Sequence, residues 1–167
     1  SSERLGAVLA LRRLANPGVA AFLNDAEPHV VLEAARAIHD VPIPAAMPSL
    51  AKLANKPGQS DPLIRRVMNA NFRTGQLENA KAVAEMAANP LLEESLRVEA
   101  ANELLEWNNP TPLDRVLGDY RPLAPRSVEV AEAIRPVMIP LFGNSGPLRE
   151  VAAKLAARYE IKVAEPL

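Results

Sequence analysis

The chain has 167 residues, enough for a domain with its own buried core. Its 19 basic and 20 acidic residues give a net charge of −1, which argues against nucleic acid as a partner because nucleic-acid binders usually carry a basic excess. It has no cysteine, so disulfides, thiol catalysis and cysteine-ligated metals are excluded, and no apolar run reaches the roughly 18 residues of a membrane span.

Hydrophobic spacing and proline positions predict helices in the first part of the chain at 3–15, 17–23, 28–40 and 44–54. Hydrophobic residues make up 49% of the chain and aromatic residues only 4%, so the core must consist of alanine, leucine and valine. The helix at 3–15 corresponds to the second member of a helix pair and lacks a cap before it. We therefore expect the chain to be a segment of a longer protein.

After a polar loop at 55–60, helices are predicted at 61–74, 76–88 and 93–107, with Gly75 as a left-handed cap of the first. The proline-rich stretch at 108–126 has no helical spacing and predicts an ordered loop. Its expected apolar anchors are Leu113, Val116, Leu117 and Tyr120. Helices at 127–142 and 147–159 complete the predicted elements.

A short pattern recurs along the chain: a residue that is usually arginine, an apolar residue three positions later, and another four positions after that. It occurs at Arg4/Ala7/Leu11, Val31/Ala34/Ile38, Arg65/Met68/Phe72, Arg97/Ala100/Leu104 and Arg149/Ala152/Ala156. A period of about thirty residues in a helical chain indicates stacked helix pairs. We predict one all-α solenoid domain, with helix pairs over 1–107, an insertion at 108–126 and a last pair over 127–167.

The turn Asp25-x-x-Pro28-x-Val30, followed by a helix with Ala34 and Ile38, resembles the turn between the helices of HEAT repeats. The resemblance implies a right-handed α-solenoid of antiparallel helix pairs. It also implies that Asp25 caps the helix after it and pairs with an arginine of a neighbouring repeat. Val31 stands where that family usually has its own arginine, so the polar ladder is expected to be interrupted there.

A narrower resemblance rests on three strings: Ala34-Ala35-Arg36-Ala37-Ile38-His39-Asp40, Asn69-Ala70-Asn71-Phe72-Arg73, and Leu113-Asp114-Arg115-Val116 with Arg121-Pro122-Leu123. Together they resemble the HEAT-like segment of exported bacterial proteins of the Planctomycetes–Verrucomicrobia group. Those proteins carry a sugar-dehydrogenase-like propeller before the repeats and a haem-binding CxxCH module after them. The resemblance implies an exported or periplasmic redox parent, with any haem or dehydrogenase chemistry outside this chain.

His39 and Asp40 could form a general base with its orienting carboxylate. Neighbours in a helix point about 100° apart, however, so we expect His39 to interact with the helix C-terminal carbonyls and Asp40 to cap the loop. Asn69 and Asn71 lie inside a predicted helix, where asparagine is disfavoured. We expect one amide to bind a neighbouring inter-repeat loop, with a ligand groove as the functional alternative.

Glu99, Glu103 and Glu106 form an acidic stripe that could attract a basic partner or a divalent cation, but such a stripe is more often a solvated face. Within the insertion, Asp114, Arg115 and Arg121 are poorly explained by helix packing. Our hypothesis is that Arg115 or Arg121 pins the loop through an ion pair to Glu103 or Glu106. Trp107 is expected to be a core anchor where the insertion begins.

These observations favour a non-catalytic module that binds a protein partner or neighbouring domains of its parent chain. The chain is expected to be monomeric, without a cofactor, metal or nucleic acid. Two enzymatic alternatives, a bilin lyase and a DNA glycosylase, also use HEAT-like repeats, but the scarcity of aromatic residues argues against the glycosylase. A small-molecule or cation sensor that uses the acidic stripe is a third alternative.

Overall fold

The computed structural model describes residues 2–163 and is all-helical over that range, with one isolated β-bridge. The described chain divides into two compact units. The first unit consists of the residues up to 70 together with 115–118, and the second of 71–114 with the residues from 119 onward. The boundary falls inside one helix, α4 (Asp61–Thr74). No helix in the described range is long and apolar enough to cross a membrane.

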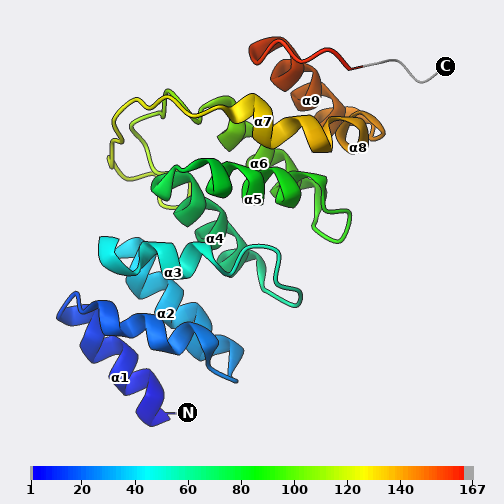
Figure 1. Cartoon of the computed structure of the whole chain (residues 1–167). Coiled ribbons are helices and arrows are strands. Elements are labelled where there is room, and N and C mark those ends of the chain that lie inside the picture. The colour runs from blue at the N-terminus through cyan, green and yellow to red at the C-terminus, as the bar shows by residue number, and fades with distance from the viewer. Residues whose placement is uncertain (1, 164–167) are drawn as a thin grey trace. The chain divides into compact units, whose positions relative to one another are not determined.

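Short helices make up the first unit, and all of its predicted helical segments are present (Figure 1). They are α1 (Ser2–Arg13), η1 (Pro17–Asn24), α2 (Pro28–Asp40), η2 (Pro44–Ala46), α3 (Met47–Ala51) and the first part of α4. The segment after Asn16 is a 3-10 helix, and the Asn16 side chain accepts a hydrogen bond from Gly18 N at 2.8 Å. The segment predicted at 44–54 is divided between η2 and α3.

The core of the first unit forms around α2, which packs against α1 and η1. Small and branched side chains fill it, including Val30, Ala34, Ala35 and Ile38 from α2, all of them fully buried. Their spacing of three and four residues is the helical period that the sequence predicts. The α2 helix can therefore approach its neighbours closely, because alanine adds little width to the contact.

The second unit contains the end of α4, followed by α5 (Leu77–Ala88), α6 (Glu94–Leu105), α7 (Val130–Ile134), η3 (Arg135–Val137), α8 (Met138–Phe142) and α9 (Gly146–Arg158). The α6 helix packs against α5 and α9, and α5 also packs against α7 (Figure 1). The prediction of a continuous helix at 127–142 is wrong. The helical segment begins only at Val130 and is interrupted by η3, where Pro136 cannot donate the hydrogen bond that an α-helix requires.

The insertion at 108–126 forms no helix and folds back on itself at an antiparallel β-bridge between Leu113 and Tyr120. These two side chains are 53% and 75% exposed, so the prediction that they anchor the loop is wrong. Leu117 is also exposed, and Val116 is half-buried. Backbone hydrogen bonds hold the two sides of the bridge together instead, from Asp114 N to Asp119 O (2.8 Å) and from Arg121 N to Pro112 O (2.9 Å).

Candidate functional site

Four polar side chains meet in the interior of the first unit. His39 is fully buried, with Nδ1 2.8 Å from Asp40 Oδ1 and Nε2 2.8 Å from Asn69 Oδ1. Arg66 donates to both oxygens of Asp40, from Nε to Oδ1 at 3.0 Å and from Nη2 to Oδ2 at 2.9 Å. The Arg66 side chain also reaches back to Pro62 O at 3.0 Å. The cluster therefore connects the end of α2 to the middle of α4.

The electrostatics of this cluster favour the charged form of Asp40. Burial raises the pKa of Asp40, but hydrogen bonds and charge from His39 and Arg66 outweigh burial, so the pKa lies below its usual value. Two parallel bonds from one guanidinium are the strong, geometrically specific form of an arginine–carboxylate pair. Because an ionised carboxylate only accepts, the His39 nitrogen that faces Asp40 is the donor of their hydrogen bond.

The expectation that His39 and Asp40 diverge is wrong, since the two side chains are hydrogen-bonded. Asp40 is the last residue of α2, and its carboxylate contacts both Nδ1 of His39 and the guanidinium of Arg66. The ring nitrogens of His39 therefore face a carboxylate and an amide rather than the last helix carbonyls. A general base needs a nitrogen within reach of a substrate. His39 offers none, so the geometry describes a structural cluster.

Asp25 occupies the turn between η1 and α2 and contacts both α1 and the residue that precedes α2. Its Oδ1 atom accepts a hydrogen bond from Glu27 N at 2.9 Å, and its Oδ2 atom pairs with Arg4 Nε of α1 at 2.9 Å. A cavity of about 420 Å³ lies beside this turn. Its apolar lining consists of Leu23, Ala26, Pro28, Val31, Leu53, Pro57 and Leu63, and its polar lining consists of Asn24, Asp25, Lys56, Gln59 and Ser60.

An arginine that lies over two adjoining aromatic rings closes the base of the insertion in the second unit. The guanidinium carbon of Arg126 lies 4.8 Å from the ring centre of Phe72 and 4.9 Å from that of Trp107. Its Nε atom donates to Trp107 O at 2.6 Å. The two rings meet edge to face at 5.4 Å, and the indole of Trp107 donates to Gly75 O at 3.2 Å. Trp107 is fully buried, which confirms the predicted core anchor.

This arrangement, which we call the arginine clamp (Phe72, Gly75, Trp107 and Arg126), depends on a glycine. Gly75 ends α4 with φ of +76°, which confirms the predicted left-handed cap. An added Cβ on Gly75 would lie 2.0 Å from Arg126 Nη1. Burial lowers the pKa of Arg126 to about 10, with Glu103 raising it and Arg73 lowering it. The aromatic faces offset part of this desolvation by cation–π attraction.

Asn108 joins the two ends of the insertion beside the clamp. Its side chain makes a pair of 3.0 Å hydrogen bonds with the backbone of Val128, one as donor and one as acceptor. Its backbone carbonyl accepts a third, also at 3.0 Å, from Arg126 N. The beginning and the end of the insertion are thereby tied together, so the loop is ordered, as the sequence predicts.

Asp114 is buried between two arginines of the second unit. Its Oδ2 atom lies 3.5 Å from Arg73 Nη1 and 3.4 Å from Arg121 Nη1. Arg73 also donates to Arg121 O at 3.4 Å. Burial and the charge of Arg121 lower the pKa of Arg73, while Asp114 raises it. Arg121 therefore makes an ion pair with Asp114, within the insertion itself. Arg115 lies at the exposed surface of the first unit.

The acidic stripe of α6 is not a solvated face. Glu103 is only 2% exposed, and Glu99 and Glu106 are half-buried. The charge of Glu103 favours the charged form of Arg126, and this attraction offsets part of the cost of burying the Glu103 carboxylate. Among the described residues, no cluster of three or more His, Asp or Glu side chains is placed to hold a metal ion.

The two helical asparagines are both buried and bind different helices. Asn69 contacts His39 of α2, and Asn71 Oδ1 accepts a hydrogen bond from Asn79 Nδ2 of α5 at 2.9 Å. These two partners are side chains of other helices. Asn79 also accepts from Gln76 N at the start of α5, so one amide serves both a helix cap and a helix contact.

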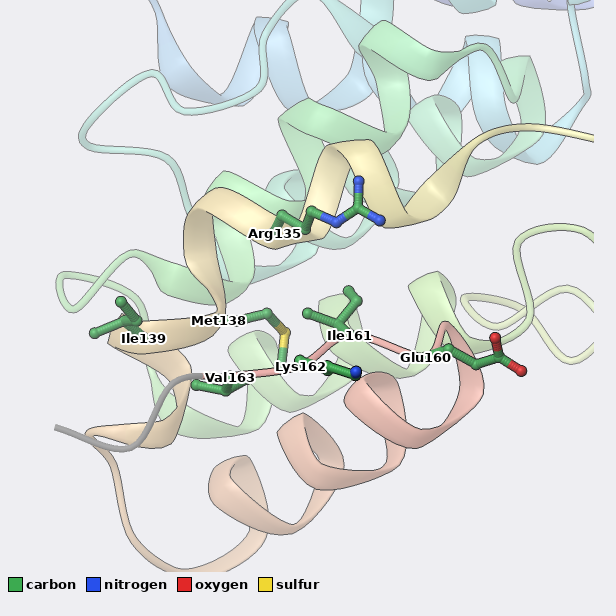
Figure 2. A pocket seen from close by; sticks show the side chains of 7 residues that line it. All are labelled: Arg135, Met138, Ile139, Glu160, Ile161, Lys162 and Val163. Atoms are coloured by element: carbon green, nitrogen blue, oxygen red, sulfur yellow. The ribbon is translucent and has the colours of Figure 1, made fainter.

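A second cavity, of about 460 Å³, lies in the second unit between η3, α8 and the chain after α9. It is lined by Arg135, Met138, Ile139, Glu160, Ile161, Lys162 and Val163. Figure 2 shows Met138 and Ile161 in the middle of the cavity and Glu160 at one end. The charged side chains that line it are exposed, so the cavity is an apolar surface hollow with a charged rim.

Comparison of the chain with protein-family models, with curated proteins and with solved structures finds no match.

Sequence reasoning missed the residues that organise these sites, namely Arg66, Asn79, Asn108 and Arg126. Arg66 lies next to Arg65, which belongs to the repeat pattern, and nothing in the spacing singles out one of the two. Arg126 follows Pro125 at the end of an irregular stretch, and its aromatic partners lie far away in the sequence. Neither residue belongs to a motif of fixed spacing, so only the folded chain identifies them.

Proposed function

We propose that the chain is a non-catalytic structural and protein-interaction module, a spacer or docking segment of a larger protein. We further propose that its helices form a HEAT-like right-handed solenoid of antiparallel pairs. Such a scaffold presents side chains from successive repeats to a partner, and its stability is approximately the sum of repeat and neighbour terms. Its function then lies in surfaces rather than in a catalytic centre.

The observation that carries this proposal is how the buried polar side chains are used. His39, the histidine most suited to catalysis by its neighbouring carboxylate, is fully buried and engaged at both ring nitrogens. Asp40 is held in turn by a bidentate arginine. These groups hold α2 against α4 and leave no atom directed at a substrate, which is the behaviour of a scaffold.

The contact of Asp25 with Arg4 supports the repeat part of the proposal. It joins the turn before α2 to α1, and the other oxygen of Asp25 accepts a hydrogen bond from the backbone of Glu27, the residue that precedes α2. A buried carboxylate that satisfies a backbone donor and a neighbouring helix fixes the spacing between consecutive helices. The same contact at successive turns would produce a regular stack.

The parent protein is proposed to be an exported bacterial oxidoreductase, on the strength of the narrower sequence resemblance. The size of the natural protein tests the segment proposal directly. An antibody raised against this chain, followed by mass spectrometry of the recognised band from source cells, should identify a polypeptide far above 18.0 kDa that stains for haem. A band near 18.0 kDa would contradict the segment proposal. A large band without haem would contradict the redox parent alone.

A further inference from the structure

The cavity beside the turn between η1 and α2 has the size and the apolar lining of a small-molecule site. Its volume is about 420 Å³, within the range of roughly 300–1,000 Å³ that ligand pockets occupy. The buried side chains of Leu23, Leu53 and Leu63 line it. Its two sides are formed by residues from 24–28 and from 56–60, two turns that lie on the same side of the first unit (Figure 1). The hollow therefore lies between two segments of the same compact unit.

The charges at the cavity indicate the sign of a ligand. Asp25 and Lys56 are the charged side chains that line it. Asp25 already pairs with Arg4 Nε at 2.9 Å and accepts a hydrogen bond from Glu27 N, so its charge is compensated within the protein. Lys56 is exposed, and none of the residues that the structure describes pairs with its ammonium group. The uncompensated charge at the cavity is therefore positive.

The side of the cavity that carries Lys56 also offers hydrogen bonds to an anion. Ser60 lines this side, and its hydroxyl can donate to a carboxylate, as the ammonium of Lys56 can. Between them in the sequence, Gln59 is held in place because its Nε2 atom donates to Leu53 O at 2.8 Å. An anionic head group fits at this side, while an apolar tail covers the leucines.

We propose that this cavity binds a small amphipathic carboxylate, with its head group at Lys56 and Ser60 and its tail against the three leucines. Asp25 at the opposite side would repel a second carboxylate, so the ligand carries a single negative charge. The cation is exposed and the hollow is open, so an eight-carbon acid should bind weakly, with a dissociation constant on the order of 1 mM. This inference does not depend on the proposed function.

Titration of the full chain with three eight-carbon probes tests the sign of the charge. Octanoate should shift the backbone amide resonances of 23–31 and 53–63 in ¹H–¹⁵N spectra, and octanol and octyltrimethylammonium should bind about three- to tenfold more weakly. Lys56→Glu should weaken octanoate binding about three- to tenfold. Lys52→Glu is the matched control, because it makes the same change of charge at an exposed lysine outside the cavity and should bind octanoate as wild type does.

Filling the cavity tests the site itself. Ala26→Trp places a large side chain at an exposed lining position and should abolish octanoate binding, whereas Ala21→Trp, exposed on η1 outside the lining, should leave it unchanged. Unchanged melting temperatures would establish that the variants are folded. Absence of octanoate-induced shifts up to about 20 mM would overturn the proposal. So would equal binding of octyltrimethylammonium, equal effects of the two glutamate variants, or shifts confined to the other cavity at Met138 and Ile161.

Discussion

At the scale of single residues, two charged side chains are removed from solvent and need partners inside the protein. Asp40 and Arg126 are both enclosed, but they are stabilised in different ways. Asp40 is held by hydrogen bonds from His39 and a bidentate arginine, which keep its pKa low. Arg126 is held by two ring faces and one backbone carbonyl, and burial lowers its pKa to about 10. We therefore expect substitutions at the two sites to have different effects.

Asp40 should make stability depend on pH. Its folded-state pKa lies below the unfolded value of about 3.9, so its stabilisation is present above that value and is lost as the pH falls through the folded pKa. Wild type should therefore exceed Asp40→Asn in free energy of unfolding at pH 6, and the difference should shrink steadily below about pH 4. Urea titrations of both proteins from about pH 6 down to about pH 2.5 measure it. A difference independent of pH would contradict the ionised pair.

Gly75 should be far less tolerant of substitution than another glycine with the same backbone conformation. Gly75→Ala places a Cβ 2.0 Å from Arg126 Nη1, in addition to the strain of φ at +76°. Gly58→Ala is the matched control, because its φ is +75° and an added Cβ would meet nothing within 4 Å. We expect losses of about 1 kcal/mol for Gly58→Ala and about 2–4 kcal/mol for Gly75→Ala. Equal losses in chemical denaturation would show that the clamp does not depend on Gly75.

At the scale of elements, the insertion is an ordered loop whose stability comes from its base. The side chains of Leu113 and Tyr120 at the β-bridge are exposed, while Asn108 and Arg126 tie the ends of the loop together. The arginine clamp then fixes this base against the ends of α4 and α6. Disturbing the clamp should therefore loosen the loop before it affects the helices of the first unit.

Arg126→Ala should report on the clamp through fluorescence. Trp107 is the only tryptophan of the chain, so its emission monitors this site alone. Removal of Arg126 uncovers one face of the indole, which should shift the emission to longer wavelength and increase quenching by iodide. Proteolysis within 108–126 should also become faster. Arg149→Ala, an exposed arginine on α9, is the control and should change neither signal. Unchanged emission from Arg126→Ala would contradict the clamp.

The sequence predicts most helices because they follow from local signals. The spacing in α2 and α9 and the left-handed Gly75 act within one or two helical turns. Pro136 is itself a local signal for a helix break, but the apolar spacing on both sides of it favours one continuous helix. The burial of Glu103 could not be predicted, because it depends on Arg126 at the far end of an irregular loop. Contacts of that kind have no fixed spacing.

At the scale of the whole molecule, the proposed repeat architecture predicts that removing one helix destabilises mainly the helices packed beside it. The α1 helix packs against α2 and η1, and its Arg4 holds the turn at Asp25. In a stacked array each repeat depends on the ones beside it, so the stability is local rather than uniform. A single cooperative core would behave differently, because loss of any large element would weaken every part equally.

Native-state hydrogen exchange on a chain lacking residues 1–15 tests this account most directly. Exchange should accelerate from Pro17 to Asp40, because η1 and α2 lose the helix that covers them. Protection of α5, α6 and α9 in the second unit should stay close to that of the full chain. That result would support a scaffold built from repeats. Equal loss of protection from η1 through α9 would contradict it.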